Sequence, residues 1–130
     1  MLSYLYIGAN DVDAFGRFYD AIFSPLSYEK EVAQEQYCFS LPDVADKSNG
    51  PGTIHVAQPF DGRPATAGNG VMLAFRADSK AQVEAAYKGG LANGGMDEGA
   101  QGYRDAYEDD FYVAYLRDPL GNKVAVFFIG

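Results

Sequence analysis

The chain has 130 residues, of which 48% are hydrophobic and 15% aromatic, so it can build the core of one domain. Ten basic and eighteen acidic residues give a net charge of −8, which argues against nucleic acid and anionic membranes as partners, because both bind positive patches. No run approaches the roughly 20 apolar residues of a membrane span, no signal peptide is evident, and a lone Cys38 rules out an intrachain disulfide, so we expect a cytoplasmic protein.

The first half of the chain has the pattern of a strand, a helix and then two or three strands. Leu2–Ile7 is a β-prone run. Asp11 offers a helix cap, and apolar residues then recur at helical spacing until Ser24-Pro25 ends the helix. The strands expected next are Tyr28–Ala33, Tyr37–Leu41 and Thr53–Gln58, with an exposed loop at Pro42–Gly52.

The same pattern then starts again. Gly70–Phe75 is the expected strand, and Ser79 with Gln82 forms a capping box for a helix. Either Gly89-Gly90 or Gly94-Gly95 closes this helix. The stretch Gly99–Tyr107 is interpreted either as a mobile rim or as an ordinary strand with a loop.

The chain closes with a hairpin, Tyr112–Phe127, whose turn contains Asp118-Pro119 and Gly121-Asn122. Pairing of Asp118 with Lys123 would place Tyr112 on the same face as Ala125. The opposite face, which carries Val124, Val126 and Phe128, would then pack against a helix.

The two halves of the chain are spaced alike. Tyr4 precedes Asp11 by seven residues, Met72 precedes Ser79 by seven, and the halves are 68 residues apart. This spacing predicts an α+β fold of two βαβββ modules in a single domain, residues 1–130. Module 1 covers about 1–60 and module 2 about 69–130, and the two sheets would join around a shared cavity.

Several segments together resemble the glyoxalase/bleomycin-resistance/dioxygenase superfamily, also called the vicinal oxygen chelate fold. They are Tyr4–Asp11, Phe18–Asp20, Gly70–Ala77 and Arg117–Lys123. The resemblance implies a mixed-sheet open barrel, a homodimer, and a divalent metal held by a His on the first strand and a Glu or His on the last strand of each module. Members include lyases, isomerases, extradiol dioxygenases, thiol transferases and metal-free drug-binding proteins.

The resemblance implies four metal-ligand positions, which are Tyr4, His55, Met72 and Ala125. All of them except His55 hold residues that are unsuitable as ligands. Alanine has no donor atom, a thioether suits soft metals only, and a tyrosine must first lose a proton with a pKa near ~10. A metal site generally needs three or more good ligands, so we expect neither a metal nor another cofactor.

We expect the concave face to bind a small organic molecule through phenol hydroxyls above a floor of small residues, unless these side chains fill a closed core. The candidate ligand-binding residues are Tyr4, Tyr6, His55, Met72, Tyr112 and Ala125. His55 is the single imidazole of the chain, so it is either a weak candidate for a catalytic base or a hydrogen-bonded structural residue. Arg76 could pair with an anion or simply end its strand at the surface.

The first functional hypothesis is therefore a metal-free, homodimeric protein that binds a small organic molecule. A second is a divergent lyase, isomerase or dioxygenase with an atypical metal or acid–base site. A third is an acidic module that sequesters a cationic, drug-like compound, for which the run Glu108-Asp109-Asp110 could provide attraction if it is more than a solvated turn.

Overall fold

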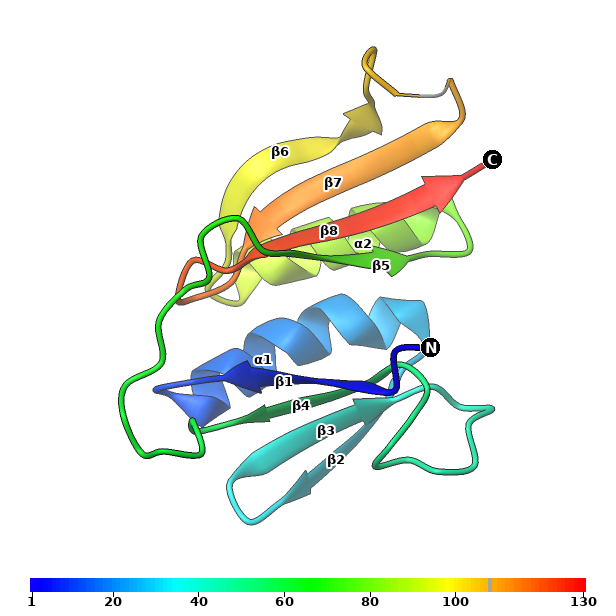
Figure 1. The fold of residues 1–130 in the computed structure, drawn as a ribbon. Helices are drawn as coiled ribbons and strands as arrows, with labels where there is room; N and C mark the ends of the chain where they lie inside the picture. The colour runs from blue at the N-terminus through cyan, green and yellow to red at the C-terminus, as the bar shows by residue number, and fades with distance from the viewer. Residues whose placement is uncertain (108) are drawn as a thin grey trace.

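The computed structural model, which describes residues 1–107 and 109–130, contains the two predicted βαβββ modules (Figure 1). Module 1 consists of β1 (Tyr4–Gly8), α1 (Val12–Phe23), the 3₁₀ turn η1 (Ser24–Leu26), β2 (Glu29–Ala33), β3 (Gln36–Ser40) and β4 (Thr53–Ala57). Module 2 consists of β5 (Met72–Arg76), α2 (Lys80–Ala92), β6 (Met96–Tyr103), β7 (Phe111–Arg117) and β8 (Lys123–Ile129). The predicted α+β fold is confirmed.

Each module forms one four-stranded mixed sheet. Sheet A has the strand order β1-β4-β3-β2, and sheet B has the equivalent order β5-β8-β7-β6. In each sheet the first strand of the module pairs in parallel with the last one, and the other pairs are antiparallel. Strands β1 and β5 are therefore both sheet edges, and each has one side without a strand partner within its sheet.

Helix termini follow the predicted capping chemistry. The Asp11 carboxylate accepts from the N–H of Ala14 at 3.0 Å, and the Ser79 hydroxyl accepts from the N–H of Gln82 at 3.2 Å. Helix α2 continues through Gly89 and Gly90, and the chain turns at Gly94, which has a φ of +90°. The second glycine pair is thus the one that follows the helix end. None of the helices in the described part of the chain is long and apolar enough to cross a membrane.

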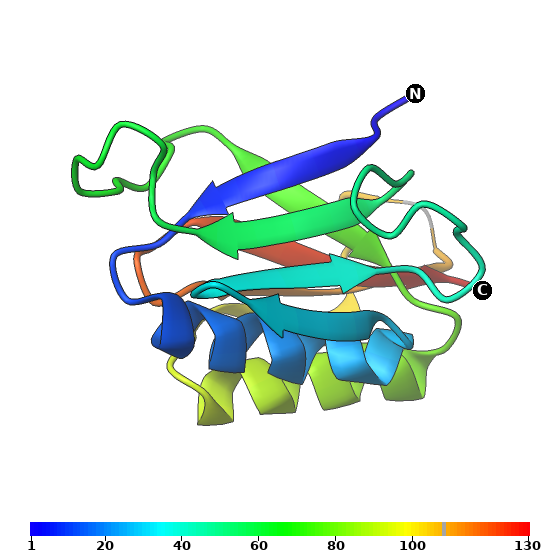
Figure 2. The same ribbon diagram turned by 90° about the horizontal axis from the view of Figure 1, so that it is seen from below.

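The two helices lie side by side, as Figures 1 and 2 show. Helix α1 packs on β3 and β4, and α2 packs on β6, β7 and β8. The Phe23 ring lies at the junction, with its centroid 5.0 Å from that of Phe39 in sheet A and 4.8 Å from that of Phe75 in sheet B. The helix-covered faces of both sheets therefore share one core.

This arrangement has a direct consequence for the other two sheet faces. Because both sheets turn one face toward the shared core, their helix-free faces lie on the outside of the molecule. The sheets are not closed into a barrel within one chain.

The closing hairpin forms, but its predicted register was wrong by one residue. Arg117, and not Asp118, pairs with Lys123, so Tyr112 lies opposite Phe128. The reason is that the Asp118 carboxylate accepts from three N–H groups of the turn, which keeps this residue in the loop. Tyr112 consequently lies on the α2 side, where its hydroxyl donates to Glu84 at 2.9 Å.

The stretch with two alternative interpretations, Gly99–Tyr107, is an irregular strand followed by a turn. Strand β6 extends to Tyr103, with shifts in its pairing to β7 around Gly99 and Gly102. In the acidic run, Asp109 and Asp110 are exposed turn residues, and Glu108 lies outside the described residues.

Candidate functional site

The helix-free face of sheet A carries three of the predicted site residues. The strand register places Tyr6 beside His55, and His55 beside Cys38. Tyr4 lies on the same face, with its ring edge-on to the His55 imidazole at 5.5 Å between centroids. Tyr4 and Tyr6 are each about half exposed, at 50% and 51%. These rings are therefore open to a ligand or to another protein surface.

Both ring nitrogens of His55 have hydrogen-bond partners. Nε2 lies 2.7 Å from the carbonyl oxygen of Ser48, and Nδ1 lies 2.9 Å from the amide nitrogen of Gln36. Because a carbonyl only accepts, Nε2 carries the proton and donates, and Nδ1 accepts from Gln36. No lone pair of this imidazole remains for a metal or for a substrate proton, so the geometry matches the structural interpretation of His55.

Residues 41–52, named here the sheet A loop, lie over the same face. The carbonyl of Lys47 accepts from the Thr53 hydroxyl at 3.0 Å and from the Cys38 thiol at 3.6 Å. The Lys47 ammonium bonds the Leu41 carbonyl at 2.8 Å and pairs with Glu29 at 3.0 Å. Burial raises the pKa of the Cys38 thiol, with a smaller contribution from Glu31. The loop is largely exposed, as predicted, but it is fixed to sheet A by several hydrogen bonds.

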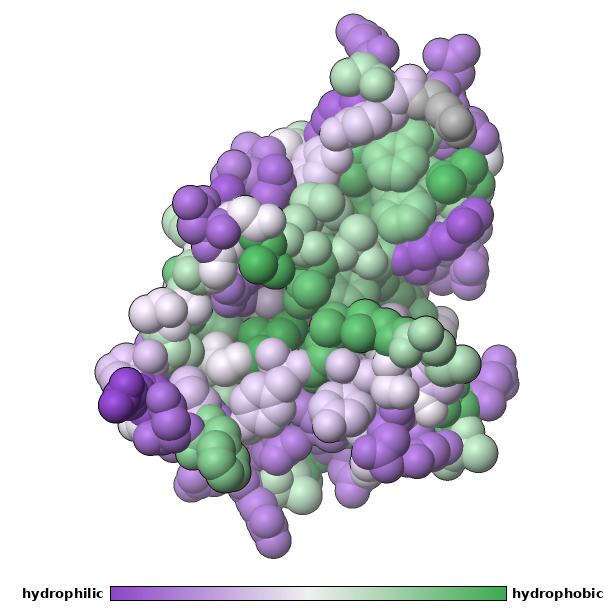
Figure 3. Space-filling model, in the orientation of Figure 1, coloured by the Kyte–Doolittle hydropathy of each residue, from purple (hydrophilic) through white to green (hydrophobic). Residues whose placement is uncertain are grey.

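The helix-free face of sheet B carries the other two positions, Met72 and Ala125. The register of β5, β8 and β7 aligns Ala125 with Tyr115 on one side and with Ala74 on the other. Ala125 is only 2% exposed, whereas Met72 is 45% exposed. Figure 3 shows a continuous hydrophobic surface over this sheet in the upper part of the view.

Aromatic rings cover one end of this face. Phe111 and Phe127 stack with centroids 5.2 Å apart and planes 25° from parallel. The Tyr107 ring lies edge-on to Phe111 at 5.3 Å. All three rings keep exposed surface on the outer side.

Two cations lie over the neighbouring tyrosine. The Lys123 ammonium is 5.0 Å from the Tyr115 ring centroid, and the Arg104 guanidinium carbon is 5.6 Å from it. Burial, followed by a hydrogen bond with Tyr107, raises the pKa of Tyr115. The correct hairpin register would have identified Tyr115 as a residue of the Ala125 face, and the predicted one missed it.

The six predicted binding residues therefore do not converge on one cavity within a single chain. Sheet A presents Tyr4, Tyr6 and His55, sheet B presents Met72 and Ala125, and Tyr112 faces α2. Within one chain these positions lie on two different sheets and on the α2 side, because the modules share a core through their helices.

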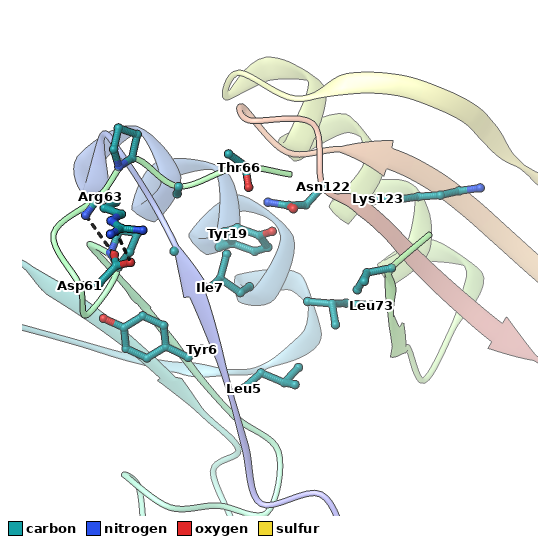
Figure 4. A pocket seen from close by; sticks show the side chains of 15 residues that line it. Leu5, Tyr6, Ile7, Tyr19, Asp61, Arg63, Thr66, Leu73, Asn122 and Lys123 are labelled. Carbon is teal, nitrogen blue, oxygen red and sulfur yellow. Dashed lines mark hydrogen bonds and ion pairs between the residues drawn. The ribbon is translucent and has the colours of Figure 1, made fainter. Parts of the chain in front are cut away.

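A cavity of about 560 Å³ does lie between the modules, where β1 and β5 meet the linker that joins β4 to β5, residues 58–71 (Figure 4). Figure 4 shows Tyr19, Thr66 and Asn122 at one end, and Leu5, Ile7 and Leu73 along the other side. Tyr6 is the single predicted site residue that lines it. The sequence did not indicate this cavity, because the apolar strand residues that line it alternate in the same way as residues of a filled core.

Asp118 joins the modules through hydrogen bonds to two residues that line this cavity, Tyr19 and Asn122. It is fully buried and accepts five hydrogen bonds, including one from the Tyr19 hydroxyl at 2.7 Å and one from the Asn122 amide at 2.7 Å. Burial, followed by the Asp118 charge, raises the pKa of Tyr19 well above its usual value. This carboxylate is therefore a structural anchor between α1 and the closing hairpin.

The residues present do not fit the divalent metal that the superfamily resemblance implies. Among residues 1–107 and 109–130, no three His, Cys, Asp or Glu side chains come together as a ligand set. Ala125 has no donor, and His55 has both nitrogens engaged.

The fold is that of an α+β protein with two βαβββ modules. In each module a helix covers one face of the mixed sheet and leaves the other face open. A crystal structure of a glyoxalase/bleomycin resistance protein from Albidiferax ferrireducens T118 is similar over 100% of this chain and 99% of that one, at 36% identity and a TM-score of 0.84. The chain belongs to the glyoxalase/bleomycin resistance protein family.

More distant solved structures share the fold. A glyoxalase-related enzyme from Fulvimarina pelagi matches 98% of this chain and 87% of its own, at 17% identity and a TM-score of 0.72. The fosfomycin resistance protein FosX from Mesorhizobium loti matches 100% and 92%, at 13% identity and a TM-score of 0.64. Scans against protein-family models and against curated protein sequences gave no match.

Proposed function

We propose that this protein is a metal-free member of its family that binds a small organic molecule on the helix-free face of sheet B, with the site completed by a second copy of the chain. The observation that carries the proposal is the open aromatic surface of sheet B around Ala125, where the resemblance implies a metal carboxylate. A surface of partly exposed rings suits an apolar or aromatic ligand.

The homodimer is argued from the seam between the modules. Exposed apolar residues gather beside the free edges of β1 and β5: Met1, Leu2, Tyr4, Tyr6, Val71 and Met72. Figure 3 shows hydrophobic surface along this seam. Open strand edges and large apolar patches are usually covered by a partner. A second copy seated here would bring sheet A of one protomer toward sheet B of the other, and would enclose the sheet B face that a single chain leaves open.

The other two functional hypotheses have less support. A catalytic site based on His55 would need a free ring nitrogen, and both are engaged. A cationic ligand would meet Lys123 and Arg104 on the sheet B face. The free thiol of Cys38 is compatible with a reducing compartment, which supports a cytoplasmic location.

Metal analysis tests the proposed function. The protein is purified without chelators, and its metal content and thermal midpoint are measured before and after dialysis against EDTA. We expect far less than one divalent ion per chain and an unchanged midpoint. One firmly held ion per chain, with a lower midpoint after its removal, would overturn the metal-free assignment.

Sedimentation velocity tests the dimer. The unaltered protein should sediment as a dimer, and Val71→Glu, which places a charge on the exposed seam, should shift it toward monomer. Lys88→Glu, on the exposed side of α2, is the matched control and should remain dimeric. A monomeric unaltered protein at micromolar concentration would refute the dimer.

A further inference from the structure

We propose that the ligand of the sheet B face is a planar aromatic anion, such as an aryl carboxylate. This inference rests on the proposed function and names the chemical class that the same face selects.

The aromatic part of the ligand is specified by the ring surface. Phe111 and Phe127 are stacked and both partly exposed, so together they offer a flat apolar platform. Exposed aromatic rings bind other planar groups by offset stacking or edge-on contact, and such contacts add to the burial of apolar area. A planar ligand gains more from this surface than a bulky aliphatic one.

The charge of the ligand is specified by three cations on or beside the face. Lys123 and Arg104 lie over Tyr115, and Arg76 pairs with Phe127 in the register and is exposed. The four ion pairs found within residues 1–107 and 109–130 include none of these three cations. Cations gathered on one face of a chain with a net charge of −8 attract an anion to that face in particular.

Ala125 leaves this positive field intact. It pairs with Tyr115 on β7 and with Ala74 on β5, and Lys123 lies two residues before it on β8. A carboxylate at this position would lie among the cations and cancel part of their charge. The alanine therefore provides no metal ligand and adds no negative charge beside the cations.

Titration calorimetry with 2-naphthoate and its neutral isostere 2-naphthamide tests the inference. We expect 2-naphthoate to bind more tightly, and its affinity to fall as salt rises from about 0.05 to 0.5 M, because screening weakens exposed charge pairs. The amide should bind weakly and with little dependence on salt.

Three variants locate the site. Lys123→Gln should weaken 2-naphthoate binding roughly three- to fivefold, the range of a partly exposed ion pair. Ala125→Glu should weaken it at least about tenfold, since it adds a repulsive charge, whereas the neutral Ala125→Gln separates charge from size. Lys88→Gln removes the same charge on α2 and should leave affinity unchanged.

The results distinguish the two proposals. Equal affinity for acid and amide, or an unaltered affinity in Lys123→Gln, would overturn the anion selectivity and leave small-molecule binding standing. Saturable 2-naphthoate binding that is unaffected by Ala125→Glu would place the ligand elsewhere and overturn the inference. A tightly bound metal ion would overturn the proposed function itself. Thermal midpoints of all variants show which of them are folded.

Discussion

At the residue scale, the Asp118 side chain accepts more hydrogen bonds than any other described side chain near the cavity. Its carboxylate accepts from three turn N–H groups, the Asn122 amide and the Tyr19 hydroxyl. Asp118→Asn would replace one acceptor oxygen by a donor that faces other donors, so we expect a loss of about 2–3 kcal/mol in the free energy of unfolding.

Urea unfolding measures this loss. Asp43→Asn, at an exposed loop position, is the control and should change stability by less than about 0.5 kcal/mol. Equal effects of the two variants would show that Asp118 has no special structural role.

Two neighbouring carboxylates make stability depend on pH. The N–H of Gly99, followed by the Tyr87 hydroxyl, lowers the pKa of Asp97, and Arg117 lowers the pKa of Glu98. A carboxyl whose pKa is lowered on folding stabilises the protein above its unfolded pKa of roughly 4, and this contribution is lost as pH falls through the folded value. The thermal midpoint should therefore drop below about pH 4, and Asp97→Asn should flatten the drop. Midpoints measured between about pH 2.5 and 5.5 check this, with Asp43→Asn expected to follow the unaltered protein.

At the element scale, the sheet A loop is held by His55 and shields Cys38. His55→Ala removes the hydrogen bond to the Ser48 carbonyl, which is worth about 1 kcal/mol, so loop opening should become roughly fivefold more frequent. The rate at which the Cys38 thiol reacts with 5,5′-dithiobis(2-nitrobenzoate) should rise by the same factor. Tyr4→Phe keeps the ring beside His55 without affecting that hydrogen bond, so it should react at the unaltered rate. A rate unchanged by His55→Ala would mean that the loop is held by other contacts.

The helices and strands were predictable from the sequence because their signals are local. The caps at Asp11 and Ser79 and the alternation along β4 and β8 each depend on a few neighbouring residues. The hairpin register was not predictable from its apolar pattern, because both registers alternate equally well and the choice depends on how the Asp118 side chain caps the turn. That single residue decided on which face Tyr112 lies.

At the scale of the whole molecule, the shared core makes the two modules one cooperative unit. Phe23 contacts rings of both sheets, so Phe23→Ala should lower the free energy of unfolding by about 3–5 kcal/mol. Unfolding followed by far-ultraviolet circular dichroism and by tyrosine fluorescence should give coincident single transitions. Phe60→Ala, at a fully exposed ring, should cost less than about 0.5 kcal/mol. Two separate transitions would show that the modules unfold independently.

How the two modules are placed relative to each other could not be predicted from the sequence. Strand parity correctly grouped Tyr4 with His55 and Met72 with Ala125, because alternation fixes which residues share a face. It does not fix where that face points, since two modules that share a core and two that close around a cavity have the same apolar pattern. The candidate ligand positions were therefore predicted to share one concave face, and their separation onto two sheets could not be predicted from alternation.

The sheet A loop also bears on whether the metal centre that the family resemblance implies could be built into this chain by evolution or design. Introducing His at Tyr4 and Met72 and Glu at Ala125 would supply three donor groups, but His55 would still be bonded to the Ser48 carbonyl and to Gln36. A metal would have to displace backbone contacts that also hold Cys38 and Thr53. Point reversions at these three positions would therefore leave His55 engaged, and a four-ligand centre would also require the sheet A loop to be rebuilt.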